Sequence, residues 1–441
     1  MHNQFVQWFR DSSPYIHAYR ETTVVISFGG EAVLDKNFYH HIHDFALLNS
    51  LGIRLVLVHG IRPQVDQRLT AQGIKPIYSH GLRITDAAAL ECVKAAAGHV
   101  KVELEALFTT SLSNSPMAGA RIRVASGNMV IAKPYGVRDG IDFGNTGQVR
   151  RIDTQAIQQK LEQNNIVLLS PIGYSITGEV FNLSAESIAT EVAIALQAEK
   201  LVLMIDGEVS HPETRQPIRQ MTTDEASQFC NTNASQLSPE QQNHLQTAIH
   251  ACENGVQRIH LLNHSIDGAV LQELFSRDGV GTLISTTLFE TLRTATLDDV
   301  GGILDLITPL EREGILTPRS RESLETNVED FIVLERDGLV VACAAAHRYQ
   351  HYGVIELAGL AVHPEYRNGK RAQRLLKHIQ QQAQEQDMHR IIILTTHTSD
   401  WFREHGFQPG TIDDLPEQRQ IEFNASRNSR VLFKTIADNV G

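Results

Sequence analysis

A carboxylate and a basic turn lie close together in the last third of this 441-residue chain. Glu356 stands in the apolar segment Gly353–Val362, and the turn Arg367–Ala372 comes shortly after it, ahead of a helical pattern. A strand, a tight turn and a helix in this order present backbone N–H groups and the positive end of the helix to an anion, most often a phosphate. A phosphate site beside a candidate base predicts a transferase with a phosphate-bearing cofactor.

The periodicity of the surrounding sequence predicts the elements that position these residues. They are the strands Phe331–Arg336, Leu339–Arg348, Gly353–Val362 and Arg390–Thr395 and the helix Lys370–Glu385. The first two strands form a hairpin, because the Asp-Gly dipeptide between them is a strong turn signal. Glu356 therefore lies on an apolar strand of this sheet, and Thr395 ends the strand that follows the helix.

The first part of the chain alternates short apolar strands with helices. Three of these strands end in the dipeptides Gly29-Gly30, His59-Gly60 and Ser170-Pro171. Repeated strand–helix units predict a mostly parallel sheet covered on both faces, so the fold class is α/β. In such sheets ligands bind at the carboxyl ends of the strands, where these three dipeptides fall.

Length and composition limit the domain organisation and the partners. We expect a helical arm at 1–20, a sheet domain at 21–286 and a second α/β domain at 287–441, since this length exceeds one ordinary core. A net charge of -12 argues against nucleic-acid and anionic-membrane partners. No apolar run reaches the roughly 20 residues of a membrane span. The four scattered cysteines lack C-x-x-C spacing, which favours a reduced, cytoplasmic compartment.

Two patterns near the N-terminus have structural interpretations. Phe5, Trp8 and Phe9 share one face of a helix, and the Ser-Ser-Pro at 12–14 predicts the start of a second short helix. This arm either caps its own domain or packs on another subunit, and both remain open. The histidines in 40–43 give only one good ligand pair on a helix, so we expect a solvated surface there and no metal.

The second domain resembles the GNAT acyltransferase superfamily in two segments. The turn matches the pattern R/Q-x-x-G-x-G/A with a Lys in place of its first Gly, and Trp401–Phe407 is similar to the ffxxxGF element. The resemblance implies acetyl-CoA as co-substrate, with its pyrophosphate held by Arg367, Gly369, Lys370, Arg371 and Ala372. The thioester and pantetheine would contact the strand residues Leu360, Ala361 and Val362.

The same resemblance assigns the catalytic groups. Direct acetyl transfer needs a neutral amine, so a base must take the proton that an amino group carries at neutral pH. Glu356 matches the proposed base, and the alternative is an ordinary surface carboxylate. Thr395 would give a proton to the leaving thiolate or position a water, and its interpretation as an ordinary β-branched strand residue is equally open.

The first domain resembles the amino acid kinase family, most closely its N-acetylglutamate kinase branch. The matching segments are Phe28–Gly30, Val58–Gly60, Gly81–Asp86, Asp142–Gly144 and Phe181–Glu186. Ser27 replaces the Lys before Gly-Gly, Arg62 stands within the glycine loop, and Glu186 replaces an Asp. Phosphoryl transfer depends on Lys or metal charge at the phosphates, so these changes argue against kinase activity.

A degenerate amino acid kinase domain fused to a GNAT domain resembles the bacterial N-acetylglutamate synthase family over essentially the full chain. The implied reaction converts acetyl-CoA and L-glutamate to N-acetyl-L-glutamate and CoA, the first step of L-arginine biosynthesis, under feedback inhibition by L-arginine. The glutamate carboxylates would bind Arg319, Arg427 and Ser429. Inhibitory arginine would contact Tyr15, His260, Glu273 and Gly279. The N-terminal helix implies a homo-oligomer, expected to be a hexamer.

Two other functions remain open. A phosphotransferase of the N-acetylglutamate kinase type predicts ATP hydrolysis or phosphorylation of N-acetylglutamate, which the changes at Ser27 and Arg62 oppose. A non-catalytic arginine-sensing protein predicts arginine binding without release of CoA. The departure of the turn at Lys370 permits this interpretation, whereas Glu356 together with Arg319 opposes it.

Overall fold

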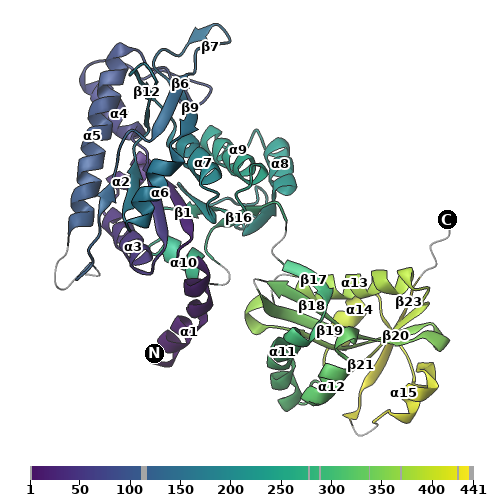
Figure 1. Ribbon diagram of the computed structural model, residues 1–441. Coiled ribbons are helices and arrows are strands. Elements are labelled where there is room, and N and C mark those ends of the chain that lie inside the picture. The colour runs from purple at the N-terminus through teal and green to yellow at the C-terminus, as the bar shows by residue number, and fades with distance from the viewer. Residues whose placement is uncertain are drawn as a thin grey trace. The chain divides into compact units, whose positions relative to one another are not determined.

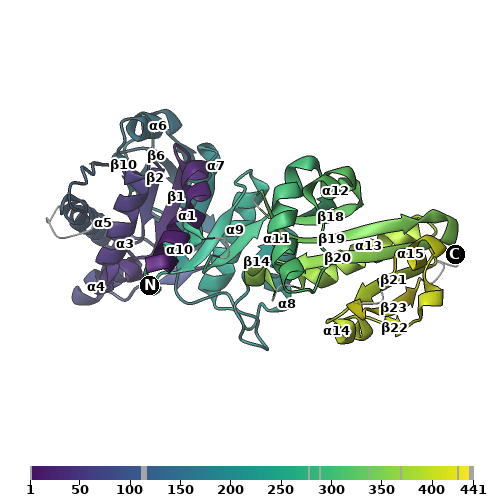
Figure 2. The same ribbon diagram turned by 90° about the horizontal axis from the view of Figure 1, so that it is seen from below.

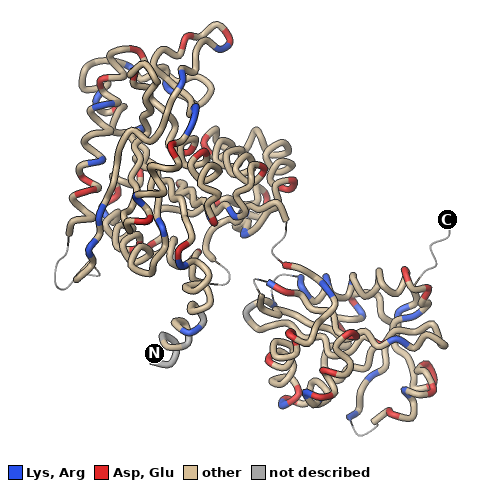
Figure 3. The backbone as a smooth tube through the Cα atoms, in the orientation of Figure 1, with Lys and Arg blue, Asp and Glu red and all other residues tan. Residues whose placement is uncertain are grey.

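The computed structural model describes residues 2–110, 117–276, 279–287, 290–336, 338–367, 370–424 and 427–436. The chain divides into two compact units, Met1–Thr287 and Leu288–Gly441, and each is described by itself (Figure 1). Acidic and basic residues are interspersed along both units (Figure 3). Within the described ranges, no helix has the length and apolarity that a bilayer crossing requires.

The first unit is built on an eight-stranded sheet with the order β14-β16-β15-β13-β1-β2-β10-β5. In chain order these strands are β1 (Thr23–Phe28), β2 (Arg54–His59), β5 (Val124–Ala125), β10 (Ile166–Leu169), β13 (Lys200–Ile205), β14 (Gln220–Thr222), β15 (Ile259–Asn263) and β16 (Thr282–Ser285). All neighbouring strands are parallel except β15 and β16. A four-stranded sheet adds β6 (Val130–Pro134), β9 (Gly147–Ile152), β11 (Ile172–Tyr174) and β12 (Val180–Asn182). Two short hairpins are β3 (Tyr78–Ser79) with β4 (Leu82–Arg83) and β7 (Val137–Arg138) with β8 (Ile141–Asp142).

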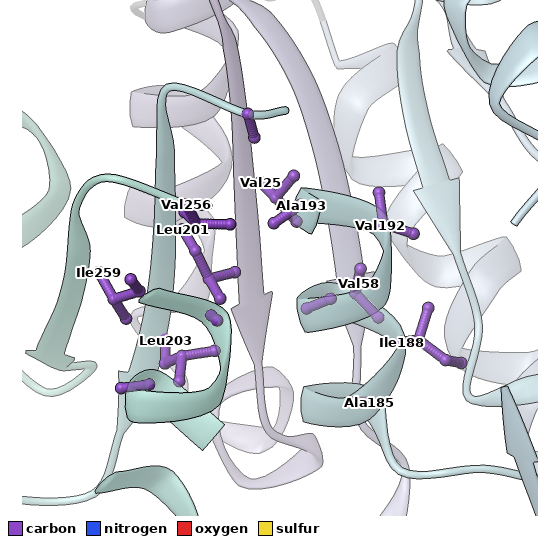
Figure 4. Packing of buried hydrophobic residues seen from close by; sticks show 14 of the residues in the cluster. Val25, Val58, Ala185, Ile188, Val192, Ala193, Leu201, Leu203, Val256 and Ile259 are labelled. Carbon is purple, nitrogen blue, oxygen red and sulfur yellow. The ribbon is translucent and has the colours of Figure 1, made fainter. Parts of the chain in front are cut away.

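Helices cover both faces of the eight-stranded sheet (Figures 1 and 2). One face packs on α6 (Thr154–Glu162), α7 (Ala185–Ala195), α8 (Thr223–Thr232) and α9 (Pro239–Glu253). The other packs on α2 (Gly30–Leu34), α3 (Phe38–Ser50), α4 (Arg62–Ala71), α5 (Ala87–Thr109) and α10 (Ala269–Phe275). Alternate residues of β1 divide between the faces: Val25 lies beside Ala193 of α7 (Figure 4), whereas Val24 belongs to the opposite core. This arrangement confirms the predicted α/β class.

The N-terminal arm is one helix, α1 (His2–Tyr19), and the predicted break at residues 12–14 is wrong because the helix continues through Pro14. Its second half packs on its own unit: Tyr19 is buried, and the Ser12 hydroxyl lies 3.0 Å from the Phe275 carbonyl of α10. Its first half leaves Trp8 and Phe9 45% and 56% exposed. The second half of the helix therefore caps its own domain, and the first half leaves an exposed apolar surface at Trp8 and Phe9.

The expected solvated surface at 40–43 is wrong for one of its histidines. His41 is buried, and its Nε2 lies 2.8 Å from the carbonyl of His264, which follows β15. Its neighbour Ile42 is also buried, whereas His40 and His43 are half-buried. The i, i+1 spacing on α3 explains the difference, because adjacent residues of a helix point in directions about 100° apart.

The second unit is built on a seven-stranded sheet with the order β17-β18-β19-β20-β21-β23-β22. Its strands are β17 (Glu290–Thr294), β18 (Phe331–Arg336), β19 (Leu339–Tyr349), β20 (Val354–Val362), β21 (Arg390–Thr395), β22 (Gln408–Pro409) and β23 (Arg430–Thr435). On one face α13 (Arg371–Glu385) packs against Ile355 and Leu357. On the other face lie α11 (Val300–Arg312) and α12 (Arg321–Thr326), while α14 (Ser399–Glu404) and α15 (Glu417–Ile421) follow later in the chain.

Two irregularities interrupt β20. It pairs in parallel with β21 only as far as Leu357 opposite Ile393, so its remaining residues have no strand partner on that side in the part of the chain that the structure describes. Against β19, three steps of β20, from Ala358 to Ala361, oppose two steps of β19, which is a β-bulge. Gly359 lies in this bulge with φ +59, a left-handed conformation that favours glycine. Both interruptions fall just beyond Glu356.

Replacing the bulge glycine tests this geometry. Gly359→Ala is expected to lower the free energy of unfolding by about 1–2 kcal/mol, because a left-handed non-glycine residue is strained. Its Cβ would also lie 2.8 Å from Nη1 of Arg319 and displace that guanidinium. Urea unfolding followed by circular dichroism measures the effect. Gly301→Ala in α11, where nothing lies within 4 Å of the added Cβ, is the control and should not destabilise. Equal stability of the two variants would contradict the strain.

Candidate active site

Glu356 is a buried carboxylate on the central strand of the second unit. It is 4% exposed, and its side chain points away from α13, since its neighbours Ile355 and Leu357 pack on that helix. Its Oε2 accepts hydrogen bonds from Arg419 Nε at 2.8 Å and from the Tyr349 hydroxyl at 3.2 Å. Among the described residues no donor reaches its Oε1. One carboxylate oxygen is thus held, and the other keeps its lone pairs for a ligand.

Sequence reasoning missed both residues that hold Glu356. Tyr349 ends β19 opposite Val354, two residues from Glu356 across the antiparallel pair, so a correct strand register could have found it. Arg419 comes from α15, 63 residues further along, and no sequence signal marks that contact. Burial and the adjoining carboxylate raise the pKa of Tyr349, so its hydroxyl stays protonated. Burial opposes the charge of Arg419, but its bond to Glu356 raises the pKa of the guanidinium.

Arg319 lies in the loop before α12, beside the bulge of β20. Its backbone N–H donates to Glu311 Oε1 at 3.0 Å, and its guanidinium lies 5.7 Å from the centre of the Phe331 ring. No carboxylate of the described chain pairs with this half-buried guanidinium. Burial lowers the pKa of Arg319, although an arginine remains protonated at neutral pH. Its donors are available, and its charge acts on Glu356.

The other two predicted substrate residues lie apart from this pair. Arg427 donates to the carbonyls of Gly314 and Ile315 and to the Thr317 hydroxyl, so it fastens the loop that carries Arg319. Ser429 lines a cavity of about 500 Å³ bounded by residues of α14, β22 and β23 and by Phe423. Arg427 is therefore linked to Arg319 through the loop that both contact or occupy. Ser429 instead lines the cavity beside α14, β22 and β23.

The parting of β20 and β21 exposes backbone groups. Leu360, Ala361 and Val362 follow the last paired residue of β20, and the edge that faces β21 has no strand partner in the described ranges. Thr395 ends β21 at the same parting and accepts a bond from Thr398 N–H at 3.1 Å. Glu356 is opposite Ile392, so strand alternation turns Thr395 to the other face of the sheet. The structure thus separates the two predicted catalytic side chains.

The basic turn is only partly free. Arg367 is exposed, Gly369 falls outside the described residues, and α13 begins after Lys370. Arg371 and Arg374 point their guanidinium groups at Glu290 of β17, whose side chain is 7% exposed; Arg371 Nε lies 2.8 Å from its Oε1. Arg371 can therefore offer an anion its backbone N–H but not its side chain. No side chain caps α13, so the first amides, including that of Ala372, are open to a phosphate.

Lys370 adopts φ +56, the left-handed conformation that a glycine at this position would adopt without strain. Lys370→Gly is therefore expected to be more stable to urea than Lys370→Ala by about 1 kcal/mol. Both variants remove the same charge, so the comparison isolates the backbone. Equal unfolding free energies for the two variants would show that the turn does not require this conformation.

Two arginines near the carboxyl ends of the strands of the first unit are paired with carboxylates. Arg83, 6% exposed, donates to Asp66 Oδ1 at 2.6 Å, and Arg62 pairs with Glu240 at 3.0 Å. Burial lowers the pKa of His59 to about 4, so this imidazole is neutral and bonds Ser170. With Ser27 in place of the lysine, the positions expected to meet phosphates carry no unpaired positive charge among these residues.

A buried hydrogen-bond relay joins two of the residues predicted to meet arginine, His260 and Glu273. His260 Nδ1 donates to Glu273 Oε1 at 2.6 Å, and Oε2 accepts the N–H groups of Val280 and Gly281 at 2.6 and 2.8 Å. Burial would raise the pKa of Glu273, but the bonds from His260 and the two amides hold it at about 2. Burial and the neighbouring Lys200 lower the pKa of His260, so its imidazole is neutral.

Gly279 and the N-terminal helix α1 also lie in the region around His260 and Glu273. Gly279 adopts φ +59, and a Cβ there would lie 2.3 Å from Oε2 of Glu273, so the close approach requires glycine. Lys200 Nζ lies 3.3 Å from Nε2 of His260 and 4.8 Å from the centre of the Tyr19 ring of α1. Tyr15 packs one turn earlier, its ring 6.3 Å from that of Tyr19. The four predicted residues are thus brought into one neighbourhood.

Both units match known families. Residues 22–263 match the amino acid kinase family, and residues 302–407 match the acetyltransferase (GNAT) family. The amino-acid acetyltransferase of Pseudomonas fluorescens (strain Pf0-1) is 46% identical, covering 98% of this chain and 100% of the relative. The amino-acid acetyltransferase of Photobacterium profundum is also 46% identical, with 98% of each chain covered.

Solved structures of N-acetylglutamate synthase from Neisseria gonorrhoeae are similar over nearly the full chain. The complex with coenzyme A and L-arginine is 38% identical with a TM-score of 0.87, covering 98% of this chain and 99% of the other. The complex with coenzyme A and N-acetyl-glutamate is 37% identical with a TM-score of 0.63 and the same coverage.

These similarities and the site define an acetyltransferase of the GNAT type joined to an amino acid kinase-like unit. This combination confirms the two resemblances predicted separately from the sequence. The chain belongs to the bacterial N-acetylglutamate synthase family, and it is an amino-acid acetyltransferase.

Proposed function

We propose that this protein transfers the acetyl group of acetyl-CoA to the α-amine of L-glutamate, giving N-acetyl-L-glutamate and CoA. The observation that carries the proposal is Glu356, with its open Oε1, near the unpaired guanidinium of Arg319. A free amino acid carries an ammonium and a carboxylate on one carbon, so neighbouring negative and positive groups are complementary to it. The N. gonorrhoeae synthase structure with coenzyme A and N-acetyl-glutamate supports this substrate.

The residues have separate tasks in the transfer. Glu356 Oε1 takes one proton from the glutamate ammonium, directly or through a water, and leaves a neutral amine. The amine nitrogen then attacks the thioester carbonyl carbon; a C–N bond forms, the C–S bond breaks, and CoA leaves as a thiolate. The thiolate takes a proton from water or from Thr395, which stands at the parting of β20 and β21. The second proton of the former amine passes to solvent.

The co-substrate is assigned to the free edge of β20 and to the basic turn. Amides of Leu360 and Val362, with Ala361 between them, would bond the thioester oxygen and the pantetheine amides. The open amides at the start of α13, with Arg367 and Lys370, would bind the pyrophosphate, and Gly369 is assigned to the same turn. The fit is supported by the absence of a capping side chain on α13 in the described structure.

The side-chain carboxylate of glutamate is assigned to Arg427 and Ser429. Arg427 donates its hydrogen bonds to the loop carbonyls and to Thr317. When glutamate binds, at least one of these bonds would be replaced by a bond to the glutamate carboxylate. The exchange would link substrate binding to the loop of Arg319. This assignment rests on the family resemblance and on the position of Ser429 at the rim of a cavity.

We further propose that the product enters L-arginine biosynthesis and that L-arginine inhibits the enzyme at the relay of His260, Glu273 and Gly279, with Tyr15 nearby. The N. gonorrhoeae complex with L-arginine supports such a site in this family. A homo-oligomer, in the form of a hexamer, is inferred from the family resemblance, and the exposed Trp8 and Phe9 of α1 supply an apolar surface for it. Four free, buried cysteines agree with a cytoplasmic location.

Thiol release from acetyl-CoA tests the transfer. Release is expected to need glutamate, and Glu356→Gln is expected to lower kcat/KM by about 100-fold to 10,000-fold, the usual contribution of a general base. Acetyl-CoA binding should be retained, since Glu356 is assigned no contact with CoA. If glutamate does not stimulate release from the wild-type protein, the synthase function is wrong, and arginine binding alone would then favour the non-catalytic sensor.

Substrate orientation is tested with two neighbouring arginines, Arg319 in the loop before α12 and Arg321 at the start of that helix. Arg319→Gln is expected to raise the KM for glutamate about 10-fold to 100-fold, because charge-assisted hydrogen bonds to a carboxylate are lost. Arg321→Gln is the matched control, since Arg321 is exposed and pairs with Glu325 at 2.8 Å. Equal effects of both changes on KM would contradict the assignment of Arg319.

The arginine site is tested by inhibition in the full-length protein. Glu273→Gln is expected to raise the arginine concentration for half-inhibition at least about 10-fold, because the relay loses its negative charge. Glu91→Gln, on the exposed face of α5 and paired with Lys94, is the control. The arginine-induced rise in melting temperature of each variant reports binding separately. Unchanged inhibition and binding in folded Glu273→Gln would place the site elsewhere.

A further inference from the structure

The two donors on Glu356 meet the same oxygen. Arg419 Nε and the Tyr349 hydroxyl both bond Oε2, at 2.8 and 3.2 Å, and neither bonds Oε1. A carboxylate held only by its charge could rotate and exchange its oxygens, whereas two donors of different direction on one oxygen fix the plane of the group. The asymmetry therefore selects one oxygen for a ligand.

We propose that Arg419 and Tyr349 are positioning residues for acetyl transfer: they clamp Oε2 of Glu356 so that Oε1 faces the amine of the acceptor. This inference rests on the proposed function, because it gives the clamped carboxylate the task of taking the amine proton. Arg419 also places a positive charge beside the carboxylate, with its Nε 2.8 Å from Oε2.

The chain segment that carries Arg419 is anchored on the sheet. The segment before α15 is anchored by Leu415, 3% exposed, which packs with Val354 of β20 and Ile392 of β21. Gln420 Nε2 donates to the Leu415 carbonyl at 2.7 Å and closes the segment on itself. The short helix thus starts from the same sheet face as Glu356, and its arginine reaches back over β20. An arginine on a surface helix without such an anchor would gain little from one ion pair.

Other titratable and charged groups also surround Glu356. They are His347 and Tyr349 of β19, Arg319, and Arg419 with Glu422 after α15, whereas β21 contributes the apolar Ile392. His347 is opposite Glu356 but turns its Nδ1 to Asp330 Oδ2 at 2.8 Å. Because this contact with Asp330 is common to all variants of Arg419, a change that depends on Arg419 reports on the clamp.

The test is kcat/KM for glutamate from pH 5.5 to 9.5, by thiol release from acetyl-CoA, in the full-length protein. Arg419→Gln is expected to lower kcat/KM roughly 10-fold to 100-fold at pH 7. It is also expected to move the acid limb of the profile, the low-pH range over which kcat/KM falls, upward by about one pH unit, since a buried carboxylate without its cation ionises less readily. Arg419→Lys should restore the position of the limb while recovering only part of the rate. Tyr349→Phe should lower the rate with a smaller shift, because it removes a neutral donor.

Arg390→Gln is the matched control, since this half-exposed arginine pairs with Asp414 just before the same segment. It should leave the acid limb in place. The clamp is overturned if Arg419→Gln lowers the rate equally at every pH, or if Arg419→Lys shifts the limb as far as Arg419→Gln does. Melting temperatures of all variants separate a loss of folding from a loss of positioning. Failure of the wild-type protein to release CoA with glutamate would instead overturn the proposed function.

Discussion

The second unit depends on the burial of one charge. An ionised carboxylate that is 4% exposed is costly unless it is paired and hydrogen-bonded, and Glu356 meets this condition through Arg419 and Tyr349. The segment that carries Arg419 is anchored on the same sheet face, and the strand that carries Glu356 loses its regular pairing immediately afterwards. The bulge at Gly359 and the parting from β21 leave unpaired backbone groups beside a paired charge. Such groups are where a ligand can substitute for a missing strand.

The first unit keeps the kinase-like sheet but pairs the arginines near its strand ends with carboxylates. Arg83 is neutralised by Asp66, and Arg62 by Glu240, so the strand ends that would hold phosphates carry closed ion pairs. Later in this unit, His260 of β15 and Glu273 of α10 form a buried hydrogen-bonded relay. Lys200 of β13 contacts His260 at its other ring nitrogen. The two arginines near the strand ends are therefore not free to stabilise a transferring phosphate.

Sequence patterns predicted the architecture more fully than the site. The strand at Glu356, the basic turn and the α/β alternation have local signals, and the structure has them where expected. Arg419 could not be found, because its contact joins positions far apart in sequence through a helix of five residues. Thr395 ends its strand as predicted, but its side chain lies on the opposite face of the sheet from Glu356, which only the register with Ile392 shows. The buried state of His41 was missed because helix phase, not composition, decides which of three neighbouring histidines turns inward.

The most direct test of acetyl transfer to glutamate is the identity of the product. The protein would be incubated with acetyl-CoA carrying ¹³C in the acetyl group and with ¹⁵N-glutamate, and the products analysed by mass spectrometry. The account predicts doubly labelled N-acetyl-L-glutamate in an amount equal to the CoA formed, with the acetyl group on the ¹⁵N atom. Labelled acetate without doubly labelled N-acetyl-L-glutamate would mean that water accepts the acetyl group, and would contradict the account.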